Sequence, residues 1–124
     1  EKVENIKAFS PGIVGNPSAI IVACINKEKY KKNNSEEGET LATIDVAMAC
    51  QNMLLAAYNL GLGACVIGSL NKIAISKLTK LPPAIIPQLL VILGYPAKIP
   101  SKPSKLPFEA VVGYEKYEGG DVNV

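Results

Sequence analysis

A nearly unbroken apolar stretch in the middle of the chain is the feature that most constrains the fold. The pattern predicts a long helix that begins near Leu41 or Thr43 and ends at Leu60, where Gly61 can supply a left-handed cap. The polar residues of this stretch share a seven-residue spacing and form one narrow stripe: Asp45, Asn52 and Asn59, with Gln51 and Tyr58 beside them. A helix that is apolar around most of its circumference must be covered on most of its sides.

The chain has only 124 residues, so it offers little material to cover such a helix. Burial of apolar surface is worth roughly 25 cal/mol per Å², and a solvent-exposed apolar face is correspondingly costly. We therefore predict that the helix packs against a second subunit. The alternative is that a sheet and smaller helices of the same chain suffice.

The remaining pattern indicates a single domain in which helices and strands alternate, as in an α/β or α+β layer fold. Strands are predicted at 18–25, 64–68 and 87–95, with a short helix at 72–79 that Asn71 can cap. Residues 1–17 read as mostly irregular, 26–39 as a solvated charged loop, and 109–117 as an edge strand that closes the domain.

Composition excludes several functional classes. The net charge is +2, every basic residue is lysine, and no basic stripe alternates with aromatic residues, so we expect no nucleic-acid partner. The chain has no histidine, which excludes Ser-His and Cys-His nucleophile pairs and His-ligated metal sites; we expect no metal. We expect no membrane span, because polar residues interrupt the apolar stretch 41–68. The three widely spaced cysteines, Cys24, Cys50 and Cys65, indicate buried reduced thiols in a cytoplasmic protein.

The segment NLGLGACVIGSLN, residues 59–71, admits two interpretations. Its glycines are typical of a helix cap followed by a turn into a strand. It is neither a dinucleotide fingerprint nor a phosphate loop, because G-x-G here ends a helix and no Gly-Lys-Ser/Thr follows. Alternatively, Gly68 and Ser69 leave backbone groups uncovered, so that a flat ring can approach them closely. Cys65 within the segment could act in redox chemistry, but a packed thiol is the better interpretation.

Two longer stretches resemble a known family. DVAMACQNMLLAAYNLGLGACVIGSL (45–70) and LTKLPPAIIPQLLVILGYPAKIPSKPSKLPFEAVV (78–112) are similar to the C-terminal half of the FMN-dependent nitroreductases, over roughly residues 41–112. This resemblance implies an α+β fold with a mixed or antiparallel sheet and a long buried central helix, assembled as an intertwined homodimer. It also implies FMN at the dimer interface, NAD(P)H as the co-substrate and a small-molecule electron acceptor such as a nitroaromatic or a quinone.

The resemblance implies particular flavin-binding residues. Residues 66–69 match the family segment that lies along the flavin ring, and Lys105, with Lys102, matches a basic stretch that holds the FMN phosphate; the whole set is Val66, Ile67, Gly68, Ser69, Lys102 and Lys105. The flavin carries the hydride chemistry, so no catalytic acid, base or nucleophile is expected from the protein.

One part of the family pattern is absent. The family's N-terminal basic clamp has no counterpart, because the chain has no arginine and its first residues match no such helix. Since the chain also begins with Glu1 rather than Met, it is either part of a longer protein or a short relative without the clamp. The alternative function is accordingly a weak flavin binder or a non-catalytic dimerising module.

Overall fold

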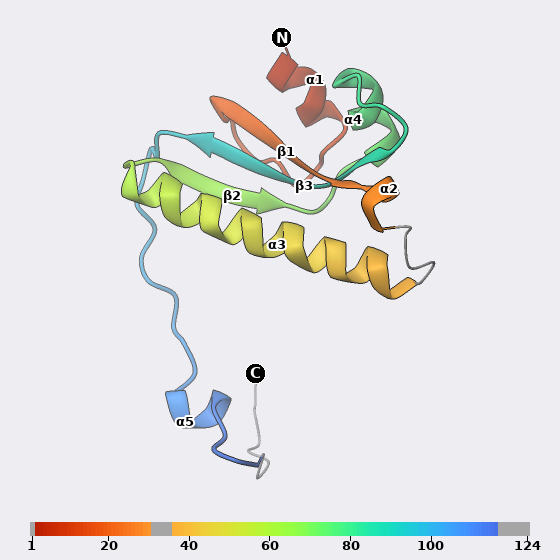
Figure 1. The fold of residues 1–124 in the computed structure, drawn as a ribbon. Helices are drawn as coiled ribbons and strands as arrows, with labels where there is room; N and C mark the ends of the chain where they lie inside the picture. Colours follow the sequence, from red (N-terminus) through yellow and green to blue (C-terminus); the bar gives the residue numbers. More distant parts are fainter. Residues whose placement is uncertain (1, 31–35, 117–124) are drawn as a thin grey trace.

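The computed structural model describes residues 2–30 and 36–116 and contains one three-stranded sheet between helices (Figure 1). The elements follow the order α1 (Lys2–Ala8), β1 (Ala19–Asn26), α2 (Lys27–Tyr30), α3 (Glu36–Asn59), β2 (Gly63–Ile67), α4 (Lys72–Leu78), β3 (Ile85–Gly94) and α5 (Phe108–Val111). The strand order is β1-β3-β2, and both pairings are antiparallel. The predicted α+β class is confirmed.

Strand β3 is the centre of the sheet and is buried on both faces. Leu90 and Val91 are both fully buried, and because successive side chains of a strand point to opposite faces, they belong to different layers. Proline is normally excluded from a central strand because it cannot donate a hydrogen bond. Here the pairing with β1 passes from Leu89 directly to Pro87 at a bulge, which accommodates the proline.

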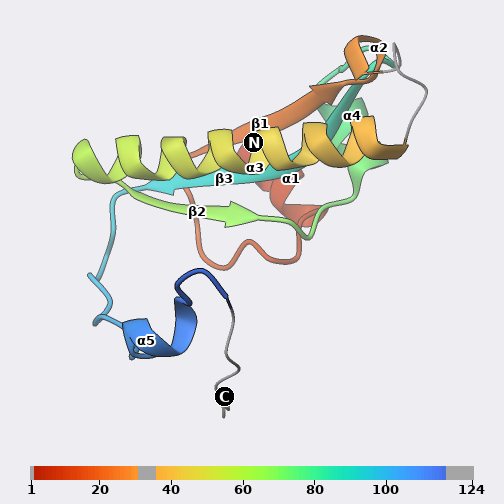
Figure 2. The ribbon, with the colours of Figure 1, turned by 60° about the horizontal axis from the view of Figure 1, so that its bottom comes forward.

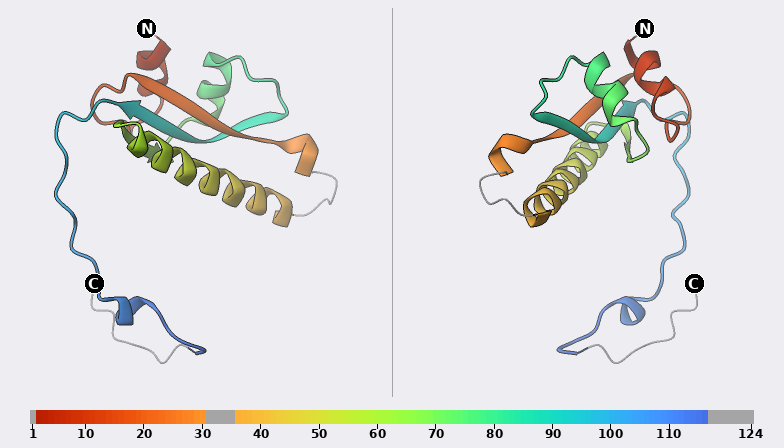
Figure 3. Two further views of the ribbon diagram at one scale, coloured as in Figure 1. Left: turned by 60° about the vertical axis from the view of Figure 1, so that its left-hand side comes forward. Right: turned by 90° about the vertical axis from the view of Figure 1, so that its right-hand side faces the viewer.

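Helices cover both faces of the sheet. Helix α3 lies along one face, and α1 and α4 lie on the other, as two further views show (Figure 3). The core on the α1 and α4 side joins two helices, two strands and the segment before β1: Ile6, Ile13, Ile67, Ile75 and Leu90.

The ends of α3 were predicted with unequal success. The C-terminal end is confirmed, because Gly61 has a φ of 74° and the amide of Leu62 donates to the carbonyl of Ala57 over 2.9 Å, as in a Schellman cap. The N-terminal end was wrong, because the helix already begins at Glu36. Asp45 therefore lies in the middle of the helix, not in its first turns, and it is exposed.

Three other predictions differ from the structure. Residues 2–8 form a helix where an irregular segment was expected, and residues 27–30 and 36–39 are helical where a solvated loop was expected; 31–35 lie outside the described residues. The predicted edge strand 109–117 was also wrong, because Phe108–Val111 is a helical turn; residue 117 lies outside the described part.

The segment after β3 forms an extended arm, residues 96–116, that leaves the body of the molecule (Figure 2). Almost all its residues are exposed, including several large apolar ones: Ile99, Leu106, Phe108, Val111 and Tyr114. The arm therefore gains little apolar burial within one chain.

Candidate functional site

The end of β2 and the turn after it form the candidate ligand shelf, residues 66–69. Ile67 is 7% exposed and packs in the core with Ile13 and Ile75, so only its backbone can meet a ligand. Val66 is half-buried, and alternation along the strand places its side chain on the opposite, α3 face. Gly68 and Ser69 are exposed. The shelf is thus mainly a backbone surface at the end of a buried strand.

The surroundings of Gly68 fit a flat ligand such as a flavin ring. A Cβ atom built at this position would meet only Leu89 Cδ2, at 3.8 Å, which is an ordinary contact. Its φ is not positive, so neither the packing nor the backbone conformation of the chain itself requires glycine here. The absence of a side chain leaves the backbone open to close approach from outside, which is what a ring lying on the shelf needs.

The N-terminal segment also borders the shelf, which the sequence did not reveal. A Cβ atom at Gly12 would overlap Ser69 Oγ, so the backbone at Gly12 lies directly on the Ser69 side chain. The amide of Asn71 donates to the carbonyl of Phe9 over 2.9 Å. A pocket of about 480 Å³ opens where these segments meet, lined by Ala8, Phe9, Pro11, Ser69, Leu70 and Asn71. These contacts join residues about sixty positions apart in the sequence, and no local sequence pattern predicts them.

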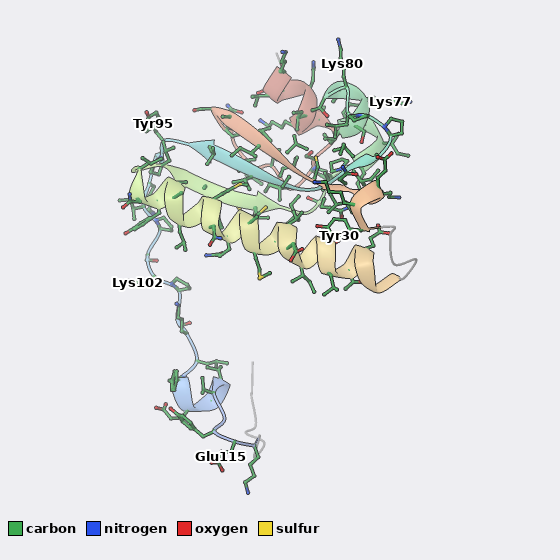
Figure 4. The ribbon with its side chains drawn as sticks, in the orientation of Figure 1. Tyr30, Lys77, Lys80, Tyr95, Lys102 and Glu115 are labelled. Carbon is green, nitrogen blue, oxygen red and sulfur yellow. The ribbon has the colours of Figure 1, made fainter. Side chains whose placement is uncertain are left out.

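Lys102 and Lys105 lie elsewhere. Both are exposed on the arm, and Figure 4 shows Lys102 on the irregular stretch that runs away from the sheet. Within one chain the structure does not bring them together with residues 66–69. The arm carries four lysines against two acids, namely Lys98, Lys102, Lys105 and Lys116 against Glu109 and Glu115.

The three cysteines are free thiols in three different environments. Cys50 is buried and Cys24 half-buried, and burial raises the pKa of each thiol. The expectation of a buried Cys65 was wrong: this residue is exposed on the edge strand β2. It also lines a pocket of about 560 Å³ between the start of β2 and the end of β3. Within the described ranges, no group of three His, Cys, Asp or Glu side chains could hold a metal ion.

The outer face of α3 is apolar and uncovered. Its large exposed side chains are between 48% and 84% exposed and occur at Leu41, Ile44, Met48, Leu55 and Tyr58. With Gln51 they occupy alternating three- and four-residue spacings, the spacing of a seam between two packed helices. The expected burial of this helix is therefore not achieved within one chain.

By length and composition alone, the part of α3 from Gly38 to Asn59 could also cross a membrane, with a mean hydropathy of 1.3. Of the most apolar 18 residues in this part of the helix, only 17% are buried inside the chain. A helix at a subunit interface meets the same criterion, so this finding is weak evidence for a span. The helix meets the criterion despite the polar residues that were expected to interrupt the apolar stretch 41–68.

The fold and the shelf define a class: an α+β protein with an antiparallel sheet, a long helix on one face and a backbone shelf at the end of β2. The sequence model of the nitroreductase family matches residues 2–95. The chain belongs to the nitroreductase family, as the resemblance predicted.

Curated relatives and solved structures agree with this assignment. An oxygen-insensitive NADPH nitroreductase of Salmonella typhimurium is 40% identical over 80 residues, covering 63% of this chain and 33% of the relative. An FMN reductase (NADPH) of Bacillus subtilis is 30% identical over 111 residues, covering 77% of this chain and 44% of the relative. The structure of NfrA1 from B. megaterium has a TM-score of 0.71 and 37% identity, covering 85% of this chain and 48% of that protein. The NADPH:FMN oxidoreductase of Vibrio harveyi, solved with NAD⁺, has a TM-score of 0.78 and 25% identity, covering 97% of this chain and 56% of that protein.

The chain is much shorter than these relatives. It spans between 33% and 51% of the length of the first three curated proteins that it matches. The fold is shared over the matched region.

Proposed function

We propose that the chain functions as an FMN-dependent NAD(P)H oxidoreductase of nitroreductase type, reducing nitroaromatics, quinones or related small acceptors. The observation that carries this proposal is the open backbone at Gly68, where an added Cβ would meet only one side-chain atom of the chain, at 3.8 Å. Membership of the family supports it, as do the names of relatives, which include a nitroreductase and two FMN reductases.

The proposed residues have distinct roles. The backbone of Val66, Ile67 and Gly68 and the exposed Ser69 would hold the ring of FMN. Lys102 and Lys105 would neutralise its phosphate, since charge-assisted contacts to phosphate are the stronger kind of hydrogen bond. When bound, FMN supplies the hydride chemistry, so no acid, base or nucleophile of the chain need react. The chain's own task is to position the ring and limit access to it.

We also propose that the working form is a homodimer in the cytoplasm. The uncovered face of α3 carries five large apolar side chains and no basic residue, and a second copy of α3 offers the matching surface. The exposed apolar arm needs a partner surface for the same reason, and in a dimer an arm could bring Lys102 and Lys105 to a shelf. Three free cysteines agree with a reducing compartment. Residues 1–124 would form a single nitroreductase-like domain.

The test is flavin binding by the purified chain and by Gly68→Val. We expect the wild type to bind added FMN with a perturbed visible spectrum, and Gly68→Val to lose binding because its methyl groups occupy the ring's place. The new side chain would contact few atoms of the protein itself, so the thermal unfolding temperature and the oligomeric mass should stay nearly unchanged. Gly68→Ala serves as the matched smaller change and should weaken binding less. Retention of FMN by a folded Gly68→Val protein would refute the assignment of the shelf. A wild-type chain that leaves added FMN unperturbed would favour a non-catalytic module.

A further inference from the structure

A third pocket lies on the α1 and α4 face, and none of its lining residues belongs to the shelf. It occupies about 410 Å³ where the start of α1 meets the end of α4. Its lining combines two lysines, two uncharged polar residues and two apolar residues, and contains no carboxylate: Lys2, Lys80, Asn5, Thr79, Ile6 and Leu78. Figure 4 shows Lys80 beside the end of α4, on the side of the sheet where α1 lies.

The charge around this pocket is one-sided. Helices α1 and α4 and the turn after α4 carry five lysines and one acid, Glu4. Neither Lys2 nor Lys80 has an ion-pair partner among the described residues. A lysine after the end of a helix, such as Lys80, also interacts favourably with the helix dipole. That interaction involves Lys80 alone and does not explain why a second lysine, Lys2, lines the same pocket.

The backbone at Lys80 adds a second observation. Its φ of 54° places it in the left-handed region, which costs a residue with a side chain about 1 kcal/mol. The turn is closed by Leu81, whose amide donates to the carbonyl of Ser76 over 2.9 Å, as Leu62 closes the end of α3. At the end of α3 the equivalent residue is Gly61. The chain thus places a charged side chain where glycine is the easier choice, and it fixes that residue at the rim of the pocket.

This combination suits a phosphate group carried by a larger organic ligand. Two unpaired ammonium groups recognise a phosphate as point charges, while Ile6 and Leu78 offer apolar contact. The pocket is also within reach of the shelf. Helix α4 begins three residues after Ser69 and its seven residues rise about 10 Å, so an extended ligand could touch both places.

From this arrangement we propose that Lys2 and Lys80 bind the 2′-phosphate of NADPH and so favour NADPH over NADH. The inference rests on the proposed oxidoreductase function, since it assigns the donor for the same shelf. It goes beyond that function because the choice between NADH and NADPH depends on these two residues. The phosphate chemistry alone would also fit inorganic phosphate, and the experiment separates the two.

The test begins with binding, which needs neither flavin nor turnover. Adenosine 2′,5′-bisphosphate and adenosine 5′-monophosphate are titrated calorimetrically into the full chain and into the variant Lys2→Gln/Lys80→Gln. We expect the wild type to prefer the bisphosphate and the variant to lose that preference, by on the order of tenfold for each lysine. Lys77→Gln is the matched control, because Lys77 lies in the last turn of α4 and does not line the pocket. It should retain the preference.

Steady-state kinetics of the FMN-loaded protein give the second readout. The double variant should raise KM for NADPH while kcat and the KM for NADH stay unchanged. An unchanged preference for the bisphosphate in the double variant would overturn the proposal. So would inorganic phosphate that competes as well as the bisphosphate, because the pocket would then be a simple anion site. A chain that lacks turnover but loses the bisphosphate preference on substitution would leave the pocket's assignment standing and refute only the oxidoreductase function.

Discussion

Replacement of Leu55 by lysine should dissociate the proposed homodimer. Leu55 lies in the C-terminal half of the exposed seam of α3, with Met48 and Leu41 one and two heptads before it. It is 59% exposed in the single chain, and burial of a whole leucine side chain is worth about 1.5–3 kcal/mol, so covering the remainder contributes about 1–2 kcal/mol. In a symmetric dimer the change occurs twice, which amounts to about 2–4 kcal/mol and a 30- to 700-fold rise in the dimer's Kd.

Sedimentation velocity over a range of protein concentrations measures this effect. Ala49→Lys is the matched control, because Ala49 is also exposed on α3 but is turned about 100° from Met48 around the helix axis, away from the seam. The control should remain dimeric. A Leu55→Lys protein that dimerises as tightly as the wild type would refute the seam, and a monomeric wild type would refute the dimer itself.

Two further expectations concern the arm and the thiols. Lys105→Gln should weaken FMN binding about tenfold or more, because it removes a charge-assisted contact to the phosphate. Riboflavin lacks the phosphate and should bind the wild type and the variant equally in a fluorescence titration. An equal loss of affinity for FMN and riboflavin would contradict a phosphate role for Lys105. Disulfide-exchange labelling should modify Cys65 first and Cys50 at least about tenfold more slowly, since burial raises the pKa of Cys50 and limits access to its thiol. Because the Cys50 thiolate forms only at higher pH, the labelling rate of Cys50 should still be rising above about pH 8.5. Early labelling of Cys50 in the folded protein would show that α3 does not pack as described.

The features that the sequence predicted correctly are those that depend on local chemistry. Gly61 closes α3 because a left-handed residue without a Cβ is needed there, and Asn71 caps α4, its Oδ1 accepting from the amide of Ala74 over 3.0 Å. Strand β3 was found because a buried central strand reads as a continuous apolar run. The predicted strand began at Pro87, whereas β3 already begins at Ile85 and a bulge accommodates the proline within it.

The features that it missed depend on contacts between distant segments. Helix α1 has a weak local pattern and is held by Ile6, which packs against Ile13 and Ile75. The predicted strand at 109–117 has the residues of a strand, but residues 109–116 have no neighbouring strand in the part of the chain that the structure describes. Without cross-strand pairs such a segment is not stable as a strand. Cys65 was expected to be buried because its neighbours are apolar, yet β2 is an edge strand. In the candidate site, the assignment of residues 66–69 to flavin binding stays a prediction, and the approach of Gly12 to Ser69 could not be predicted from the sequence.

The two faces of the sheet differ in charge, which predicts different responses to salt. The face covered by α3 presents a seam without lysine, whereas the α1 and α4 face carries five lysines against one acid. Salt screens exposed charges, because the Debye length falls from about 10 Å at 0.1 M to about 3 Å at 1 M, but it does not weaken apolar association. Raising the salt concentration over this range should therefore raise KM for NADPH more than KM for NADH, while the dimer's Kd stays constant or falls. If salt weakened dimerisation and NADPH binding in parallel, one charged surface would be responsible for both. The assignment of dimerisation to the α3 face and of NADPH binding to the α1 and α4 face would then be wrong.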